Sequence, residues 1–499
     1  EMGIQTFFNG PESFTPDGRP YLGPTAEVRG LYLATGMNSN GILNSGGVGL
    51  TMAEWMIDGA PSRGMGPMLA RRAHRAAEAV GFHYGVSWAG RQVHSARGIR
   101  KVPLHDRLAS AGATFAERIG WEIPMYFDPE KKGWNEEPNL WWKDWSPLVQ
   151  EECLAARDAA VLIDQSMYAK IQVQGPDAVH ALNRVCGAQM DVPIGNSVYT
   201  QFLNTRGGIE ADVTVTRIAP ECFMVITGHP SQTRDPAWIR DHADPAWRFE
   251  IFDATSAYGL ITLHGPKSRE ILASLTGDDL SNAAFPFGAA REIDIAYARG
   301  WAIRRSFLGE LGYELLLPTE FTLHVYDALM AAGRPLGLRH MGMFAMNACR
   351  LEKGFRHFGH DIGEGGTPYE AGLGFAVDLN KDDAFLGKDV LAEQQANGPA
   401  QRSRTLSCIV EGVDATSGPY LIHNEPIWRE GHLVGHVTSG DWGFRLEAMV
   451  GLASLHQDDG VTKAWIDEGG FEVQIAGKMY PLRVQLAPYY DRTGAIMRG

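Results

Sequence analysis

Two acidic residues, Asp212 and Glu314, lie in segments whose residue types could serve proton transfer or ligand binding. Asp212 follows the double glycine Gly207-Gly208 and begins an uncharged, alternating run, which predicts a strand with a partly desolvated carboxyl. Burial raises a carboxyl pKa, which suits proton exchange with a weakly basic ligand nitrogen. The glycines would let a flat ligand approach the backbone closely. The alternative is a hairpin turn in which Asp212 only bonds the local backbone.

Glu314 lies in the apolar run 313–317, which follows a glycine-rich segment at 306–312. A carboxylate in such a strand needs a partner. The N–H donors of a ligand such as a pterin would provide one. An ion pair with Arg304 or Arg305 is the alternative explanation.

Basic residues gather at 350–361 in an otherwise acidic chain, and Arg350 is the first of them. They could anchor the carboxylates of a glutamate tail, or they could be solvated charges at a helix end. The spacing of His357 and His360 permits a metal, but no third ligand is apparent, so we predict no metal site.

Composition excludes several classes of protein. The 45 Lys and Arg residues against 59 Asp and Glu residues give a net charge of -14, so nucleic acid is not expected as a partner. No apolar run approaches the roughly 18 residues of a membrane span. The five scattered cysteines indicate a reducing compartment, and we expect a soluble cytoplasmic protein, or a mitochondrial matrix protein if the source is eukaryotic. The chain opens with Glu1, and its first segment is typical of the middle of a protein sequence rather than of its start, which suggests a fragment, a processed chain or a split subunit.

An internal repeat indicates two similar α+β units that would position the acidic residues. Residues 171–187 match residues 261–277, each a strand ending at glycine, then a proline and a helix closing at a second glycine. Further strands are predicted at 212–218, 222–227 and 313–317. Beyond about residue 387, short β runs at 407–410, 432–438 and 471–475 predict a small C-terminal β-barrel.

The first 61 residues predict a strand at 30–35, a glycine-rich turn at 36–41 and a helix at 50–57 that ends at Gly59 and Pro61. Nucleotide sites use this arrangement, but it is also a common packing unit. Residues 62–145 are interpreted as a connecting domain, with a helical stretch at 68–80 and tryptophans that we expect in a packed interface. These tryptophans are Trp134, Trp141, Trp142 and Trp145.

Four motifs, at 198–212, 309–314, 350–362 and 367–374, together make the chain resemble the dimethylglycine dehydrogenase and sarcosine dehydrogenase family. The C-terminal half of that family is similar to the aminomethyltransferase (T-protein) of the glycine cleavage system. The resemblance implies an α+β, T-protein-like folate-binding fold with a C-terminal β-barrel. A linker domain and the tail of an FAD-dependent oxidoreductase domain would precede it. The implied domains are 1–61 (flavin-domain tail), 62–145 (connecting domain), 146–386 (tetrahydrofolate-binding domain) and 387–499 (barrel).

The resemblance also implies roles for individual residues. Asp212 matches the catalytic carboxylate near folate N10, and Glu314 matches the residue that hydrogen-bonds the pterin. Phe307 stands where the family usually has Tyr, so a hydroxyl near the folate is missing. Further folate-binding residues on the same pattern are Tyr199, Gly207, Gly208, Thr214 and Arg350. The residues expected to face a flavin are Gly36, Met37, Asn38, Ser39, Asn40, Gly41 and Ile42.

The implied reaction is the tetrahydrofolate-dependent demethylation of a small N-methyl amine. A flavin would oxidise the N-methyl group to an iminium, and folate would take up the carbon as 5,10-methylenetetrahydrofolate. The dinucleotide fingerprint GxGxxG is missing, so FAD is expected only if another polypeptide or an upstream part of the same chain supplies the flavin half. Two alternatives stay open: a folate-dependent methyltransferase or demethylase without flavin, and a non-catalytic folate-binding subunit of a complex.

Overall fold

The computed structural model describes residues 14–15, 20–25, 28–59, 61, 78, 91–133, 143–396, 403–416 and 418–499. The expected helix at 68–80 lies outside these residues except for position 78, as do Trp134, Trp141 and Trp142. Trp145, the described member of the tryptophan cluster, stacks on Tyr126 and Phe344 at ring-centroid distances of 5.7 and 5.5 Å. It therefore lies in a packed aromatic cluster.

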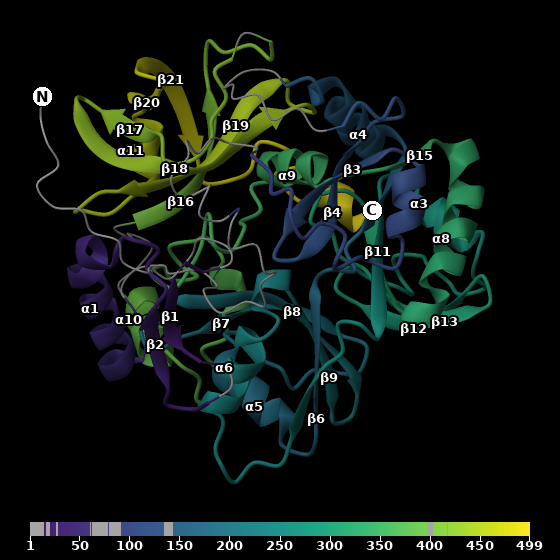
Figure 1. Ribbon diagram of the computed structural model, residues 1–499, viewed down its shortest axis with the longest axis horizontal. Helices are drawn as coiled ribbons and strands as arrows, with labels where there is room; N and C mark the ends of the chain where they lie inside the picture. The colour runs from purple at the N-terminus through teal and green to yellow at the C-terminus, as the bar shows by residue number, and fades with distance from the viewer. Residues whose placement is uncertain are drawn as a thin grey trace, which may run out of the picture.

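Two β-sheets form the centre of the molecule (Figure 1). The antiparallel five-stranded sheet has the order β10-β6-β9-β8-β7, and the six-stranded sheet has the order β12-β13-β14-β11-β5-β15. The strands of the first are β6 (Ala169–Gln174), β7 (Ser197–Leu203), β8 (Ile209–Ala219), β9 (Cys222–Thr227) and β10 (Glu250–Asp253). The strands of the second are β5 (Ala160–Asp164), β11 (Tyr258–His264), β12 (Ala290–Ile295), β13 (Ala298–Ile303), β14 (Gly312–Pro318) and β15 (Leu338–His340).

Helices cover one face of each sheet. Alternate residues of β8, such as Val213 and Val215, pack in one core with α5 (Ala178–Val185) and α6 (Arg234–His242). The six-stranded sheet packs in the same way against α7 (Ser268–Ala273) and α8 (Thr319–Gly333). The opposite faces meet in a small core that contains Met224, Leu260 and Leu316. Side chains alternate along a strand, so the residues between these apolar ones face the space between the two sheets.

The internal repeat is confirmed as two β-turn-α units, β6 with α5 and β11 with α7. Each strand ends at a glycine with positive φ, +135° at Gly175 and +119° at Gly265. An ideal Cβ on Gly265 would lie 2.6 Å from the Ala159 carbonyl oxygen, so the chain approaches another backbone too closely for a side chain. Both helices end before the predicted second glycine, at Val185 and Ala273.

The predicted C-terminal barrel is confirmed as a closed barrel of six strands. Its strands are β16 (Ser403–Val410), β17 (Pro426–Arg429), β18 (His432–Gly443), β19 (Ala448–His456), β20 (Phe471–Ile475) and β21 (Lys478–Gln485). The barrel shares a core with α4 (Ser146–Asp158), α9 (Met343–Glu352) and the hairpin of β3 (Ala113–Arg118) and β4 (Trp121–Phe127). Residues 113–127 of the segment that we interpreted as a connecting domain thus pack against α4, α9 and the barrel. Shorter helices are α3 (His105–Ser110), α10 (Lys388–Ala396), α11 (Lys463–Asp467) and α12 (Ala495–Arg498).

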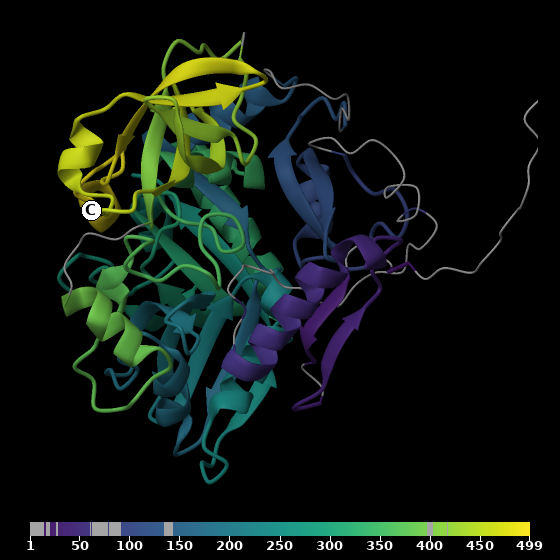
Figure 2. The same ribbon diagram turned by 90° about the vertical axis from the view of Figure 1, so that its left-hand side faces the viewer.

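The N-terminal region forms a hairpin of β1 (Tyr21–Pro24) and β2 (Tyr32–Thr35) followed by α1 (Gly41–Asp58), beside the central sheets (Figure 2). The predicted helix start at residue 50 is wrong, because Gly46, Gly47 and Gly49 lie inside α1. Glycine weakens a helix by about 1 kcal/mol but does not forbid it. The predicted end is right, since Gly59 caps α1 with φ of +80°.

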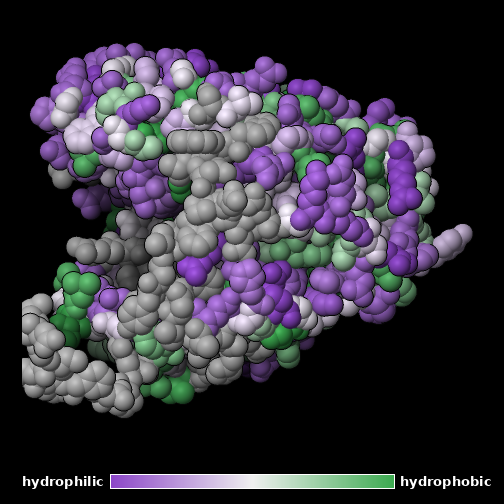
Figure 3. Space-filling model, turned by 45° about the horizontal axis from the view of Figure 1, so that its top comes forward, coloured by the Kyte–Doolittle hydropathy of each residue, from purple (hydrophilic) through white to green (hydrophobic). Residues whose placement is uncertain are grey.

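The surface around the barrel end carries mostly hydrophilic side chains, with hydrophobic ones scattered between them (Figure 3). None of the helices in the described part of the chain is long and apolar enough to cross a membrane.

We expect Gly265→Ala to lower the free energy of unfolding by about 2–3 kcal/mol, because the new methyl group meets a backbone carbonyl and the left-handed φ disfavours alanine. Urea unfolding would measure the change. Gly277→Ala is the matched control, since no heavy atom lies within 4 Å of an ideal Cβ there. Equal stability of both variants would show that the close approach at Gly265 does not constrain the fold.

Candidate active site

One face of the hairpin β7-β8 carries the polar residues of the site. The register pairs Gln201 with Asp212 and Tyr199 with Thr214, and these residues alternate with the apolar ones that pack on the helices. Gln201 Nε2 donates to Asp212 Oδ1 at 2.9 Å. Asp212 thus lies within the strand and bonds a neighbouring side chain, which argues against the turn interpretation.

The environment of Asp212 adapts it to proton exchange near neutral pH. Burial raises the pKa of its carboxyl to about 6, and the hydrogen bonds with Gln201 and Tyr199 oppose this rise. The Tyr199 hydroxyl is held neutral, because burial and the neighbouring Asp212 raise its pKa well above the usual value. The side chain of Gln201 also has a buried Oε1 with no hydrogen-bond partner in the structure. An acceptor and a titratable carboxyl therefore lie side by side.

Glu314 lies on β14, in the opposite sheet. Burial raises the pKa of its carboxyl, and the charge of Arg305 lowers it only in part. In the described part of the chain, no hydrogen bond or ion pair is formed with the Glu314 carboxylate. The two neighbouring arginines bond other groups: Arg305 donates to Ser197 Oγ at 3.0 Å, and Arg304 donates to the Phe285 carbonyl at 2.7 Å. The expected ion pair with Arg304 or Arg305 is therefore not formed.

A second acceptor without a partner lies beside Glu314. Thr262 on β11 is its register partner, and the buried Thr262 Oγ1 has no hydrogen-bond partner in the structure. Tyr168 is also near, since burial and the charge of Glu314 raise the pKa of its hydroxyl to about 12. Unsatisfied buried polar atoms are uncommon in proteins and call for a ligand, water or an ion.

Arg305 connects the two halves of the site. It follows β13 and donates to Ser197 on β7, so it joins the two sheets. Burial lowers its pKa to about 10, whereas the nearby Glu314 and Tyr199 oppose this change. We considered Arg305 only as a partner of Glu314 and missed this bridge. We also missed Gln201, although the alternation of β7 could have placed it opposite Asp212.

The double glycine is packed against the chain's own backbone. An ideal Cβ on Gly208 would lie 2.0 Å from the Glu364 carbonyl oxygen, and one on Gly207, where φ is +76°, would lie 3.2 Å from Leu391. Asn204 closes the turn, because its Oδ1 accepts the amides of Arg206 and Gly208 at 2.9 Å. These contacts give a structural reason for glycine at both positions. The contact of Gly207 and Gly208 with folate stays a prediction.

Arg350 forms a buried ion pair, so it is not one of the solvated helix-end charges that the sequence left as an alternative. Its Nη1 donates to Asp361 Oδ2 at 2.6 Å, and the Arg350 side chain is 3% exposed. Asp361 also accepts the hydroxyls of Thr438 and Ser439 on β18, so the pair connects α9 to the barrel. A folate contact of Arg350 stays a prediction. The ion pair with Asp361 does not favour it, because the guanidinium already has a buried partner.

The remaining residues singled out in the sequence are Phe307, the pair His357 and His360, and the turn 36–42. Phe307 stacks on Phe355 at 5.9 Å. The His357 and His360 rings lie 4.9 Å apart, but the described residues contain no group of three or more potential ligands placed to hold a metal. In the turn 36–42, Asn38 is buried and accepts the Thr15 amide at 2.7 Å. The other six residues of that turn are partly or fully exposed.

Comparisons with known proteins agree with this geometry. The GCVT N-terminal domain family matches residues 104–381, more than half of the chain, and the glycine cleavage T-protein C-terminal barrel domain matches residues 405–491. The aminomethyltransferase T of the glycine cleavage system from Bartonella henselae has a TM-score of 0.65 and 25% identity, covering 79% of this chain and 99% of that one.

Two curated relatives match over the whole of this chain. The 4-methylaminobutanoate oxidase (formaldehyde-forming) of Paenarthrobacter nicotinovorans is 38% identical, and the mitochondrial sarcosine dehydrogenase of Mus musculus is 32% identical. The chain spans 60% and 59% of their lengths. On these matches, the chain belongs to the GCVT N-terminal domain family and carries the glycine cleavage T-protein C-terminal barrel domain after it.

Proposed function

We propose that this chain binds tetrahydrofolate between the two sheets and uses it to capture the carbon that an N-methyl amine loses on oxidation, forming 5,10-methylenetetrahydrofolate. One observation carries the proposal: two partly buried carboxyl groups lie on facing sheets beside polar atoms, and among the described residues neither carboxyl has a bonded cation and the polar atoms have no hydrogen-bond partner. A reduced pterin offers several N–H donors to such acceptors.

The residues of this chain would bind and orient the folate and move protons. Glu314, with Thr262 beside it, would accept hydrogen bonds from the pterin. Asp212 would lie near the reactive nitrogens, where a group with a pKa of about 6 can both accept and return a proton. Gln201 holds the Asp212 carboxyl in place. Bound folate would supply a nucleophilic nitrogen for the one-carbon unit. We further assign Tyr199 and Thr214, on the same strand face, to the folate-binding surface.

The oxidation itself requires a flavin half. We propose that a flavin-domain polypeptide, or an upstream part of the same chain, packs on α1, where hydrophobic side chains lie open. Ile42, Leu43 and Ile57 are 94%, 82% and 82% exposed. The exposed residues of the turn 36–42 would then face the flavin. The described residues offer no phosphate-binding fingerprint, so FAD is not assigned to this chain alone. We place the protein in the cytoplasm, or in the mitochondrial matrix if the source is eukaryotic.

Replacement of Asp212 tests the catalytic role. We expect Asp212→Asn to leave the Kd for tetrahydrofolate within about 3-fold and to reduce methylene transfer at least about 100-fold, because the amide cannot exchange a proton. The protein would be assayed with its flavin-bearing part, an N-methyl amine and tetrahydrofolate, and both formaldehyde and 5,10-methylenetetrahydrofolate would be measured. Formaldehyde should replace the folate product.

Asp294→Asn is the control for this substitution, since Asp294 is 61% exposed and pairs with Arg299 on the surface. Unchanged transfer in Asp212→Asn would refute the proton role and would favour a non-catalytic folate-binding subunit. Transfer from a methylated compound by material without flavin absorbance would favour the flavin-independent alternative.

Replacement of Glu314 tests the pterin contact. We expect Glu314→Gln to weaken tetrahydrofolate binding about 10- to 100-fold, because hydrogen bonds to a charged acceptor are stronger than those to an amide. Titration calorimetry would measure it, with Glu320→Gln at an exposed position as the control. Equal affinity in both variants would remove Glu314 from the binding site.

The pKa of Asp212 also predicts how stability depends on pH. Folding raises this pKa from 3.8 to about 6, so the native state binds more protons than the unfolded state in this range. The Asp212 contribution to the free energy of unfolding should therefore fall as pH rises from about 4 to 6 and stay constant above. Thermal unfolding of the wild type and Asp212→Asn across this range should show the variant gaining in relative stability. A difference independent of pH would mean that the carboxyl is not desolvated.

A further inference from the structure

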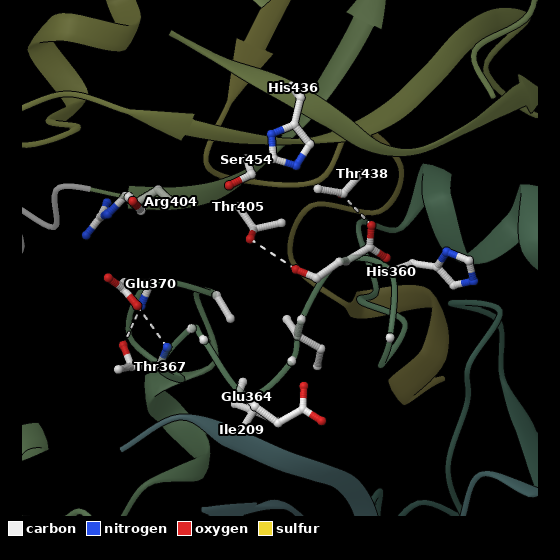
Figure 4. A pocket seen from close by; sticks show the side chains of 18 residues that line it. Ile209, His360, Glu364, Thr367, Glu370, Arg404, Thr405, His436, Thr438 and Ser454 are labelled. Carbon is white, nitrogen blue, oxygen red and sulfur yellow. Dashed lines mark hydrogen bonds between the residues drawn. The ribbon is translucent and has the colours of Figure 1, made fainter. Parts of the chain in front are cut away.

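Asp441, on β18, carries a desolvated carboxyl group of the barrel. The residue is half-buried, and burial raises the pKa of its carboxyl to about 6. Figure 4 shows Thr438, earlier on the same strand, at the wall of a cavity of about 420 Å³ between the loop 359–371 and the barrel. Asp441 does not line this cavity. It lies instead on the stretch of β18 that contacts α9.

The hydrogen bonds of Asp441 leave part of its acceptor capacity unused. Its Oδ1 accepts the Trp442 amide at 2.8 Å, and its Oδ2 accepts Asn347 Nδ2 at 3.2 Å. Asn347 Oδ1 accepts Arg350 Nε at 3.0 Å, so the amide nitrogen is the end that points to Asp441. An ionised carboxylate can accept more than two hydrogen bonds. The carboxylate is therefore held in place but can still accept donors from a ligand.

No cation in the described part of the chain bonds the Asp441 carboxylate. The charges that act on it are those of Arg350, which lowers its pKa, and Glu352, which raises it. Both already have buried partners, because Arg350 pairs with Asp361 and Glu352 pairs with Arg445. A cationic ligand would stabilise the ionised form of Asp441, which burial destabilises.

Aromatic residues lie close to this carboxyl. Burial and the charge of Asp441 raise the pKa of the Tyr420 hydroxyl, so Tyr420 lies near the acid. Phe344 precedes Asn347 by three residues on α9, so the two side chains lie on the same face of the helix. The Phe344 ring stacks on Trp145 at a ring-centroid distance of 5.5 Å.

The chemistry of this place suits an organic ammonium ion. Ser146, which directly follows Trp145, hydrogen-bonds the Tyr420 hydroxyl, so Tyr420 belongs to the same place as the stacked rings. An ammonium ion is attracted to the faces of aromatic rings, and its N–H groups donate to a carboxylate. A metal ion fits less well, because the described residues contain no group of three or more potential metal ligands.

We propose that Asp441 and Tyr420 bind the ammonium group of a small alkyl amine. Two sources share this chemistry: the N-methyl amine before it is oxidised, and the demethylated amine that leaves after one-carbon transfer. The binding itself requires neither folate nor flavin. The assignment of the amine as reactant or product rests on the proposed function.

The test is an NMR titration of the full chain with dimethylammonium and with methylammonium, read from the line widths of the methyl protons. At pH 8 these amines are protonated and Asp441 is ionised. Sodium chloride at the same ionic strength would correct for unspecific attraction to an acidic protein.

Four variants separate the charge from the ring. Asp441→Asn removes the charge and keeps an acceptor for the Trp442 amide. Asp294→Asn is its control, since Asp294 is exposed and pairs with Arg299. Tyr420→Leu removes the ring, and Tyr420→Phe keeps it. Thermal unfolding of each variant would confirm that it is folded, and the Tyr420 pair tests the site even if Asp441→Asn is not.

We expect dimethylammonium to bind the wild type with a Kd on the order of 1 mM, near the limit for a ligand of this size. Asp441→Asn should weaken binding at least about 10-fold, and Tyr420→Leu about 3- to 10-fold. Tyr420→Phe and Asp294→Asn should stay within about 2-fold of the wild type. Tighter binding of dimethylammonium would assign the site to the N-methyl amine, and tighter binding of methylammonium would assign it to the demethylated product.

The proposal is overturned if neither ion binds, if Asp441→Asn binds as well as Asp294→Asn, or if Tyr420→Leu binds as well as Tyr420→Phe. None of these results would affect the proposed function, because the titration contains no folate. Conversely, a chain that bound dimethylammonium but not tetrahydrofolate would contradict the proposed function and keep this site.

Discussion

Burial of carboxyl groups between two facing sheets, without a cation bonded to them, is the constraint on which the site depends. Such burial destabilises the ionised form, and Asp212 and Glu314 have raised pKa values for this reason. Desolvation is tolerated because each sheet has its own helix-covered core on the far side, which supplies the stability that the inner faces lack. The repeated β-turn-α unit builds both cores in the same way.

Several of the other buried carboxylates in this molecule have a structural role and are paired with an arginine. Arg445, with a fully buried side chain, bonds both Glu310 and Glu352 and joins the barrel to α9 and to the loop before β14. Arg350 holds Asp361 in the same manner. In each case a guanidinium compensates the buried charge. Asp212 and Glu314 differ, because Asp212 bonds the Gln201 amide and no guanidinium bonds either carboxylate in the described part of the chain. This difference supports the proposed ligand-binding role of the two acids.

Sequence patterns predicted the parts of this structure that depend on local order. The repeat, the strands 222–227 and 471–475 and the barrel follow from alternation and glycine placement, and all are confirmed. The start of α1 was wrong because glycine lowers helix propensity without preventing a helix. The partners of Arg350 and Arg305 could not be predicted, because they come from residues 11 and 108 positions away in the chain. Family resemblance located Asp212 and Glu314, but only the structure shows that no cation of the described residues bonds either carboxylate.

The end of α1 is attached to the turn that leads into β8. The Thr205 hydroxyl donates to the Asp58 carbonyl at 2.7 Å, and Arg206 pairs with the Asp58 carboxylate at 2.6 Å. Both partners of the ion pair are about one-third to one-half exposed, so it contributes at most about 1 kcal/mol. A junction this weak can open without unfolding either side. While it is formed, it fixes the end of α1 to the turn that precedes the strand of Asp212.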